Sequence, residues 1–272
     1  MRNRILFFGA LAIALAISCA KNPFTGKQTL ALVPNSEILP SAFAQYGTFL
    51  KENKVITGTS DANKVVNVGT KIKNAAEKWL NANGYKGYLN DYKWEYNLVD
   101  SKEVNAWCMP GGKIVVYSGI LPITKDEAGL ATVLGHEVSH ALANHGQQRM
   151  SAGMLQQLGA VGVGAAVGGK SAEVQQIAMT AYGATTEIGG MLPFSRSHET
   201  EADQIGLTLM AIAGYNPEQA VVFWSRMSAA SSGSAPPEFL STHPSDATRI
   251  ANLKKLVPVA KAEASKFGVI YK

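Results

Sequence analysis

Residues 130–143 read LATVLGHEVSHALA, and this stretch decides how the chain is interpreted. His136 and His140 are four residues apart, and apolar residues flank them on both sides. Residues i and i+4 lie about 40° apart around an α-helix and about 6 Å apart along its axis, so both imidazoles can reach one ion. Two idle histidines on a buried helix would be costly, and the stretch therefore predicts a metal site on a buried helix.

Zinc is the metal that this pattern indicates. Zinc binds histidine nitrogens at about 2.0–2.1 Å and keeps an open position in catalytic sites. Glu137 directly follows the first histidine and can accept a proton from an attacking water molecule. H-E-x-x-H on a helix is typical of zinc metallopeptidases. We therefore predict one zinc ion as the cofactor, His136 and His140 as ligands, and Glu137 as a catalytic residue.

A third protein ligand must come from elsewhere in the chain. His145 comes five residues after the second histidine and would be rotated about 140° from it, which favours a polar residue at the helix end. Residues 195–203, SRSHETEAD, place Glu199 and Asp203 on one helical face. We predict Glu199 as the third zinc ligand and Asp203 as the acceptor of the distal N–H of a ligand histidine. His198 is a weaker alternative ligand.

Composition excludes several classes of protein. The chain has 272 residues, of which 46% are hydrophobic and 17% charged, so a sizeable core is expected and general disorder is excluded. The net charge of +5 comes without a block of Lys and Arg, and we predict no nucleic-acid partner. Two cysteines exclude a disulfide-dense scaffold and a Cys-rich zinc ribbon.

The N-terminus reads as an export signal. Two arginines precede the uncharged run 5–17, ILFFGALAIALAI, which is shorter than the ~20 residues of a membrane span. Small residues before Cys19 resemble a bacterial lipoprotein signal, and this resemblance implies cleavage after residue 18 and lipidation of Cys19. An ordinary secretory peptide is the alternative. We predict a bacterial protein attached to the outer membrane by its lipid anchor only, facing the periplasm.

Residue periodicity predicts a mostly helical chain with a small β-sheet. A capping box at 124–127 begins the helix that carries the two histidines. Strands are expected at 92–99 and at 113–117, after the turn PGG at 110–112. Residues 151–192 are rich in Gly and Ala and are expected to form a mobile segment near the cleft. Helical patterns cover about 41–54, 61–82, 125–147, 195–213, 217–230 and 245–265.

The domain organisation follows from these elements. We predict a signal peptide over 1–18, a lipid-anchored N-terminal arm over 19–40 and a single zinc metallopeptidase domain over 41–272. The sequence GAAVGGKS at 164–171 matches a phosphate-binding loop letter for letter. No Asp in a suitable strand context follows it, so we predict no nucleotide partner.

Four motifs stand out along the chain: Asn105-Ala106 with PGG at 110–112, HEVSH at 136–140, ETEAD at 199–203, and His243-Pro244 with Arg249. Together they resemble the CaaX-protease-like peptidase family M48. The arm NPFTGK at 22–27 is also similar to that of the family's bacterial lipoprotein members. The resemblance implies a gluzincin, zincin-like domain with the HExxH helix at its centre. It also implies an endopeptidase that cleaves misfolded or unassembled envelope proteins.

The resemblance adds three candidate site residues. A strand within 104–117 can pair with an extended peptide, and Asn105 can bind that peptide's backbone, unless it is a structural residue at the strand end. His243 can stabilise the oxyanion of the transition state with help from Arg249, which we favour. It can instead occupy the open zinc position and hold the enzyme latent, or lie in a turn far from the metal.

A different class of function remains as the alternative. The same scaffold can serve a non-catalytic or dual-role assembly factor or holdase for outer-membrane proteins. Glu137 distinguishes the two, because a degenerate enzyme commonly loses this residue or a metal ligand. Its presence favours the endopeptidase acting on unfolded or extended polypeptide.

Overall fold

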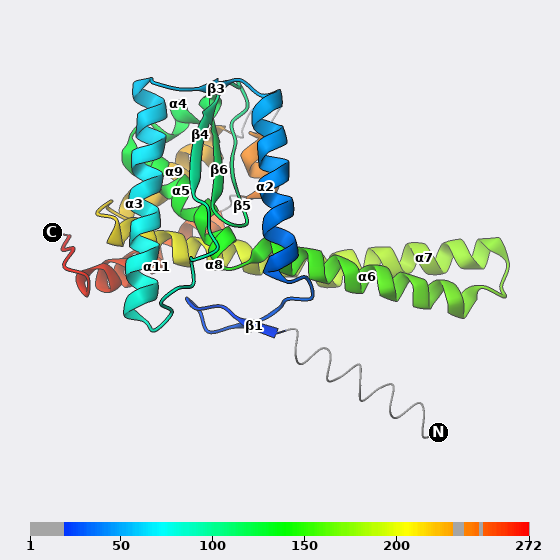
Figure 1. The fold of residues 1–272 in the computed structure, drawn as a ribbon. Helices are drawn as coiled ribbons and strands as arrows, with labels where there is room; N and C mark the ends of the chain where they lie inside the picture. Colours follow the sequence, from blue (N-terminus) through cyan, green and yellow to red (C-terminus); the bar gives the residue numbers. More distant parts are fainter. Residues whose placement is uncertain (1–18, 231–236, 245–246, 272) are drawn as a thin grey trace. The chain divides into compact units, whose positions relative to one another are not determined.

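The fold is shown as a computed structural model that describes residues 19–230, 237–244 and 247–271 (Figure 1). The predicted signal peptide, residues 1–18, lies outside the described residues. The chain divides into two compact units. The first unit comprises the residues up to Ile38 together with Asn144–His198, and the second comprises Leu39–Ala143 and Glu199–Lys272.

A four-stranded sheet organises the second unit. Its order is β3-β4-β6-β5, with β4 and β6 parallel and the two outer pairings antiparallel. The strands are β3 (Val55–Ile56), β4 (Glu95–Val99), β5 (Ala106–Met109) and β6 (Lys113–Tyr117). β6 coincides with the predicted strand 113–117, and β4 is shorter than the predicted 92–99. β3 and β5 are not predicted from the sequence, because strands this short gain their hydrogen bonds only when the sheet assembles.

Helices cover both faces of this sheet. Tyr46 of α2 packs on Val99 and Val115, and its hydroxyl donates to the carbonyl of Ile114 at 3.2 Å. On the other side α3 contacts β4, α5 contacts β5, and α9 and α11 form a further layer over α5 (Figure 1). The helices are α2 (Asn35–Glu52), α3 (Ser60–Ala82), α4 (Leu121–Thr124), α5 (Glu127–Leu142), α8 (Leu192–Ile212), α9 (Glu218–Ala230), α10 (Glu238–Thr242) and α11 (Ala247–Ser265).

Helix α5 is shorter than the predicted helix 125–147. Asp126 caps its start by accepting a hydrogen bond from the amide of Gly129 at 2.8 Å, so the predicted capping box at Thr124 is wrong. The helix ends at Leu142 because Asn144 adopts a left-handed conformation with φ +55°. Every residue from Gly129 to Leu142 is buried, as the apolar flanks of the histidines predict.

The first unit contains a β-hairpin and a pair of antiparallel helices. β1 (Cys19–Lys21) pairs with β2 (Gln28–Leu30), so part of the predicted N-terminal arm is a hairpin. The Gly- and Ala-rich segment, for which no helix is predicted, forms most of α6 (His145–Val167), α7 (Ala172–Thr186) and the π-helical turn η2 (Glu187–Met191). Residues 164–171, the phosphate-loop match, form the end of α6 and the turn after it instead of following a strand.

Two glycines allow α5 and α8 to cross at van der Waals distance. A Cβ atom added to Gly206 would lie 2.9 Å from the carbonyl carbon of Gly135 and 3.0 Å from the amide nitrogen of His136. Backbone atoms cannot move aside as a flexible side chain would. The crossing therefore requires glycine at 206, directly beside the first histidine of the motif.

We predict that Gly206→Ala destabilises the protein by about 1–3 kcal/mol, because the added methyl group overpacks the crossing. Gly47→Ala is the matched control, since Gly47 lies in α2 and a Cβ there meets no atom within 4 Å. The control should be neutral or stabilising by up to about 1 kcal/mol. Urea unfolding of both variants measures the difference, and equal changes in stability would contradict the close crossing.

Candidate metal centre

Four buried side chains of the second unit converge on one point. Their ligand atoms all lie within 4.8 Å of one another. They come from two long helices and from the residue that follows α10: His136 and His140 on α5, Glu199 on α8, and His243. The structure thus brings together the three predicted zinc ligands and His243.

The spacing of the donor atoms fits a tetrahedral zinc site. The Nε2 atom of His136 lies 3.1 Å from Nε2 of His140, 3.1 Å from Nδ1 of His243 and 3.2 Å from Oε2 of Glu199. Glu199 Oε1 is 3.2 Å from Nε2 of His140, and Oε2 is 2.9 Å from Nδ1 of His243. Donors held about 2.0–2.1 Å from one zinc ion at tetrahedral angles lie about 3.3 Å apart. The residues present fit this metal.

The protonation preferences of two donors suit metal binding. Burial alone would raise the pKa of Glu199, but His136 and the other histidines outweigh it and hold the pKa far below its usual range. Burial lowers the pKa of His140 well below its usual value. His140 therefore offers a neutral imidazole, the form that binds zinc. Burial would lower the pKa of His136, but Glu199 and Asp203 outweigh it and raise the pKa to about 9, so zinc binding must displace a proton from this ring.

Asp203 lies against the second ring nitrogen of the first predicted ligand. Its Oδ1 atom lies 3.0 Å from Nδ1 of His136, the ring nitrogen turned away from the other donors, as the sequence analysis expects. Burial alone would raise the pKa of Asp203, but Arg249 and His136 outweigh it and lower the pKa. An ionised carboxylate at this nitrogen selects the tautomer whose Nε2 lone pair faces the metal.

Arg249 links Asp203 to the turn that carries His243. It donates from Nη2 to Asp203 Oδ1 at 2.6 Å and from Nε to Oδ2 at 2.8 Å. It also donates from Nη1 to the carbonyl of Pro244 at 3.0 Å, and its guanidinium lies 3.4 Å from the ring centre of Trp224. This arrangement favours a positioning role for Arg249 over the predicted assistance to the oxyanion.

Aromatic side chains pack against the turn that contains His243. Trp224 of α9 stacks on Phe239 of α10 with ring centres 5.6 Å apart, and Phe239 lies 4.7 Å from the ring of His243. Both aromatic side chains are fully buried. The sequence analysis did not include them, because a single Trp or Phe in an amphipathic helix carries no signal of a nearby metal.

Glu137 lies at the centre of this arrangement. It is buried on α5, and its Oε1 atom is 3.3 Å from Nε2 of His243. Cys108 of β5 is close to it: burial and then the charge of Glu137 raise the pKa of the Cys108 thiol well above its usual value. The edge strand β5 packs against α5, the helix that carries the predicted catalytic glutamate.

Other predicted residues lie apart from the four donors. Asn105 precedes β5, its Oδ1 accepts from the amide of Ala106 at 2.9 Å, and it is not one of the four donors. His198 stacks on His145 in the first unit with ring centres 4.1 Å apart, so the alternative ligand His198 is not in the donor group. Cys19 begins β1.

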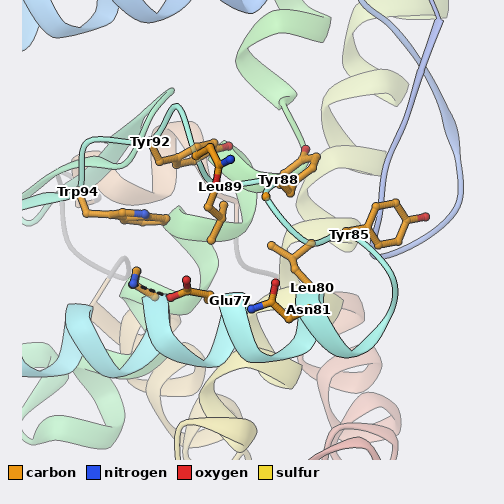
Figure 2. A pocket seen from close by; sticks show the side chains of 11 residues that line it. Glu77, Leu80, Asn81, Tyr85, Tyr88, Leu89, Tyr92 and Trp94 are labelled. Carbon is orange, nitrogen blue, oxygen red and sulfur yellow. Dashed lines mark hydrogen bonds and ion pairs between the residues drawn. The ribbon is translucent and has the colours of Figure 1, made fainter.

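Two tyrosines hold the C-terminal end of the ligand-bearing helix. Tyr88 donates to the carbonyl of Leu142 at 2.8 Å, and Tyr92 donates to the carbonyl of Ala141 at 3.1 Å. The last four carbonyls of an α-helix have no amide partner four residues further on, so the two hydroxyls stabilise the last turn of α5. Both tyrosines line a pocket of about 190 Å³ next to α3, and Figure 2 shows Tyr92 stacked over Trp94 with Tyr88 farther along the same pocket.

Residues 70–257 match Peptidase family M48. The chain belongs to this family of metallopeptidases. The predicted family, the mostly helical fold class, the class of enzyme and the zinc cofactor are therefore confirmed.

Three relatives show the range of the family that this chain resembles. Mitochondrial metalloendopeptidase OMA1 of Schizosaccharomyces pombe is 38% identical over 177 residues, which is 64% of this chain and 50% of the relative. OMA1 of Saccharomyces cerevisiae is 33% identical over 221 residues, 77% of this chain and 61% of the relative. The Beta-barrel assembly-enhancing protease of Escherichia coli is 30% identical over 188 residues, 65% of this chain and 38% of the relative. The chain thus matches between about two fifths and three fifths of their lengths.

The predicted bacterial outer-membrane location is contradicted by these comparisons. Matching proteins of fungi, a plant and vertebrates are named mitochondrial metalloendopeptidases. The prediction rested on the residues before Cys19, a short N-terminal pattern outside the family domain. Such a pattern carries far less information than the match over residues 70–257.

We predict that Asp203→Ala weakens zinc affinity about 10–100-fold, because His136 loses the acceptor that orients its ring. Competition with a chromophoric chelator measures the affinity. Asp100→Ala is the control, since Asp100 is an exposed residue paired with Lys54 and should leave zinc affinity unchanged. Equal affinity in both variants would show that Asp203 does not orient the ligand.

Proposed function

We propose that the chain is a zinc-dependent endopeptidase that cleaves unfolded or unassembled polypeptides in protein quality control. The observation that carries this proposal is the tetrahedral spacing of the four donor atoms, with Glu137 buried beside them. The names of the relatives support it, since each is a metalloendopeptidase or a protease. Lipidation of Cys19 stays a prediction from the sequence motif.

The residues have distinct roles in hydrolysis. His136, His140 and Glu199 would hold the metal, which supplies a Lewis acid for the scissile carbonyl and makes water more acidic. Glu137 accepts the proton of the attacking water and delivers it to the leaving amine. Burial of Glu137 keeps this proton transfer away from bulk solvent. Asp203 keeps the first histidine in its binding tautomer throughout.

The edge strand β5 is the proposed docking site for the substrate backbone. Within the described sheet β5 pairs with β6 alone, so its other edge can pair with an extended peptide. The amide of Phe239 donates to the carbonyl of Val104, just before this strand, at 3.0 Å. The carbonyl of Val104 therefore already accepts a hydrogen bond from α10. Asn105 follows Val104 directly and is proposed to bind the peptide backbone.

His243 occupies the position where substrate and water must enter. It lies 2.9–3.1 Å from two of the ligand atoms, as a fourth ligand does, and α10 holds it there through Phe239. Arg249 also donates a hydrogen bond to the carbonyl of Pro244, and this contact fixes the turn that holds His243 beside the other donors. Both active roles stay open, but this geometry favours a resting-state ligand over the oxyanion role that the sequence analysis preferred.

The alternative function is an assembly factor or holdase on the same scaffold, with or without catalysis. The observation that favours it is the name of the Escherichia coli relative, which combines assembly enhancement with protease. Aggregation of an unfolded client in the presence of Glu137→Gln protein separates the two functions. A pure protease would not suppress aggregation in that variant.

We predict that Glu137→Gln reduces casein hydrolysis about 10²–10⁴-fold while zinc stays bound, because the amide cannot accept the proton of water. Zinc content per chain and hydrolysis are measured on the same sample. Glu52→Gln, an exposed change at the end of α2, is the matched control and should retain full activity. Normal turnover in Glu137→Gln would assign the base to another residue.

We predict that His243→Ala cleaves unfolded casein several-fold faster than the wild type, because the fourth position is no longer blocked. His243→Cys restores a zinc-binding side chain and should remain slow. Thr242→Ala, an exposed neighbouring residue, should behave as the wild type. A decrease of ~10²-fold or more in His243→Ala would instead assign His243 to the oxyanion.

A further inference from the structure

The helical hairpin of α6 and α7 in the first unit carries an unusual surface. Among the described residues, α6 is the helix long and apolar enough to cross a membrane, yet 6% of its apolar stretch is buried. It is therefore neither a core helix nor, beginning at His145, an N-terminal signal. The large apolar side chains exposed on the hairpin are Met150, Met154, Leu155, Leu158, Val161, Val174, Ile177 and Met179.

The two helices turn polar side chains toward each other. Tyr182 donates its hydroxyl to the carbonyl of Gln156 at 2.9 Å, and the Gln156 amide donates to the hydroxyl of Thr186 at 2.8 Å. A Cβ atom on Gly159 would overlap the Tyr182 hydroxyl, so glycine there allows the close packing. Interhelical hydrogen bonds and small residues at the contact are the means by which helices associate in lipid.

Charged residues are restricted to the ends of the hairpin. Residues 150–167 contain no charged side chain and extend roughly 27 Å as a helix. Arg149 precedes this stretch, and Lys170 and Glu173 stand at the turn between the helices. α7 then has no charged residue from Val174 to Thr186. Each helix is therefore free of charge over its whole circumference along most of its length.

The restriction of charged residues to the ends of the hairpin favours contact with lipid over contact with a protein partner. A partner protein, including a second copy of this chain, covers one side of a helix and leaves charges acceptable on the others. A helix that is hydrophobic all round belongs in a core or in a membrane, and residues 158–167 of α6, LGAVGVGAAV, contain no polar side chain. The core is excluded here by exposure, since Val161 is 71% and Leu158 66% exposed.

We propose that the α6–α7 hairpin is a lipid-binding element that embeds its outward apolar side chains in a bilayer. Leu158, Val161 and Ile177 contact the hydrocarbon, while Lys170 and Glu173 stay among the headgroups. Opposite charges at the turn give little preference for anionic lipid, so binding depends on the buried apolar area. This contact adds to any lipid on Cys19 and is independent of it.

The experiment places an environment-sensitive NBD fluorophore on the full-length chain. The background carries Cys19→Ser and Cys108→Ser, and the label is attached through Leu158→Cys. Val259→Cys is the matched control, because Val259 is also an exposed apolar residue, at 56%, but lies on α11 of the second unit. The probe is a vesicle of dioleoylphosphatidylcholine alone.

We expect vesicles to shift the emission of the label at 158 to shorter wavelength and to raise its intensity several-fold. High salt should not reverse the change, since screening does not weaken apolar burial. The label at 259 should not respond. No response at 158 overturns the proposal, as does an equal response at both positions. A blue shift that grows with protein concentration without vesicles also overturns it, by showing that a second copy covers the hairpin.

A second set of variants keeps the test independent of the label position. With the fluorophore moved to Met154→Cys, the triple change Leu158→Asp, Val161→Asp and Ile177→Asp should abolish the response. The control triple changes the exposed residues Val66, Val222 and Val259 to Asp and should retain it. Circular dichroism verifies that both triples keep their helices. A retained response in a folded hairpin triple contradicts the proposal.

Discussion

The use of both ring nitrogens of His136 is the constraint on which the centre depends. Nε2 faces the other metal donors, and Nδ1 faces Asp203 at 3.0 Å. Glu199 and Asp203 stand one turn apart on α8, so one face of that helix supplies a metal ligand and the group that orients a second ligand. This is possible only where α5 and α8 cross closely, and Gly135 and Gly206 permit that crossing.

The Asp203 carboxylate also connects the metal centre to the turn that contains His243. Arg249 bridges Asp203 and the carbonyl of Pro244, so the residue that orients a ligand also holds the turn after His243. Trp224 and Phe239 pack beneath this bridge. Opening of the site must therefore break the Arg249 contact with Pro244 or carry Arg249 along. The contacts that order the metal centre are thus the same ones that hold His243 beside it.

The candidate catalytic residues and the exposed apolar surface belong to different units. All the donors, Glu137 and β5 belong to the second unit, whereas the first unit contains the apolar α6–α7 hairpin. The chain reaches the hairpin directly after the helix of the histidines and returns through α8, which carries Glu199. The hairpin is inserted in the sequence between the two helices that carry metal ligands. Its proposed role, binding to a membrane, is therefore separate from that of the catalytic residues.

The sequence by itself determined the parts that depend on local spacing. Residues i and i+4 on a helix must share a face, so the amino-acid order alone pairs His136 with His140 and Glu199 with Asp203. The buried helix followed from its apolar flanks, and β6 from its place directly after the turn PGG at 110–112. The helical hairpin could not be read in the same way, since Gly and Ala give weak periodicity.

Only the tertiary structure decided what depends on long-range contact. The position of His243, the bridge made by Arg249 and the packing of Trp224 join residues that are far apart in the chain. No periodicity relates such residues, because loop and helix lengths between them set their distance. The short strands β3 and β5 escape sequence-based prediction for the same reason: their hydrogen-bond partners lie in other segments, and neither strand is stable until the sheet forms.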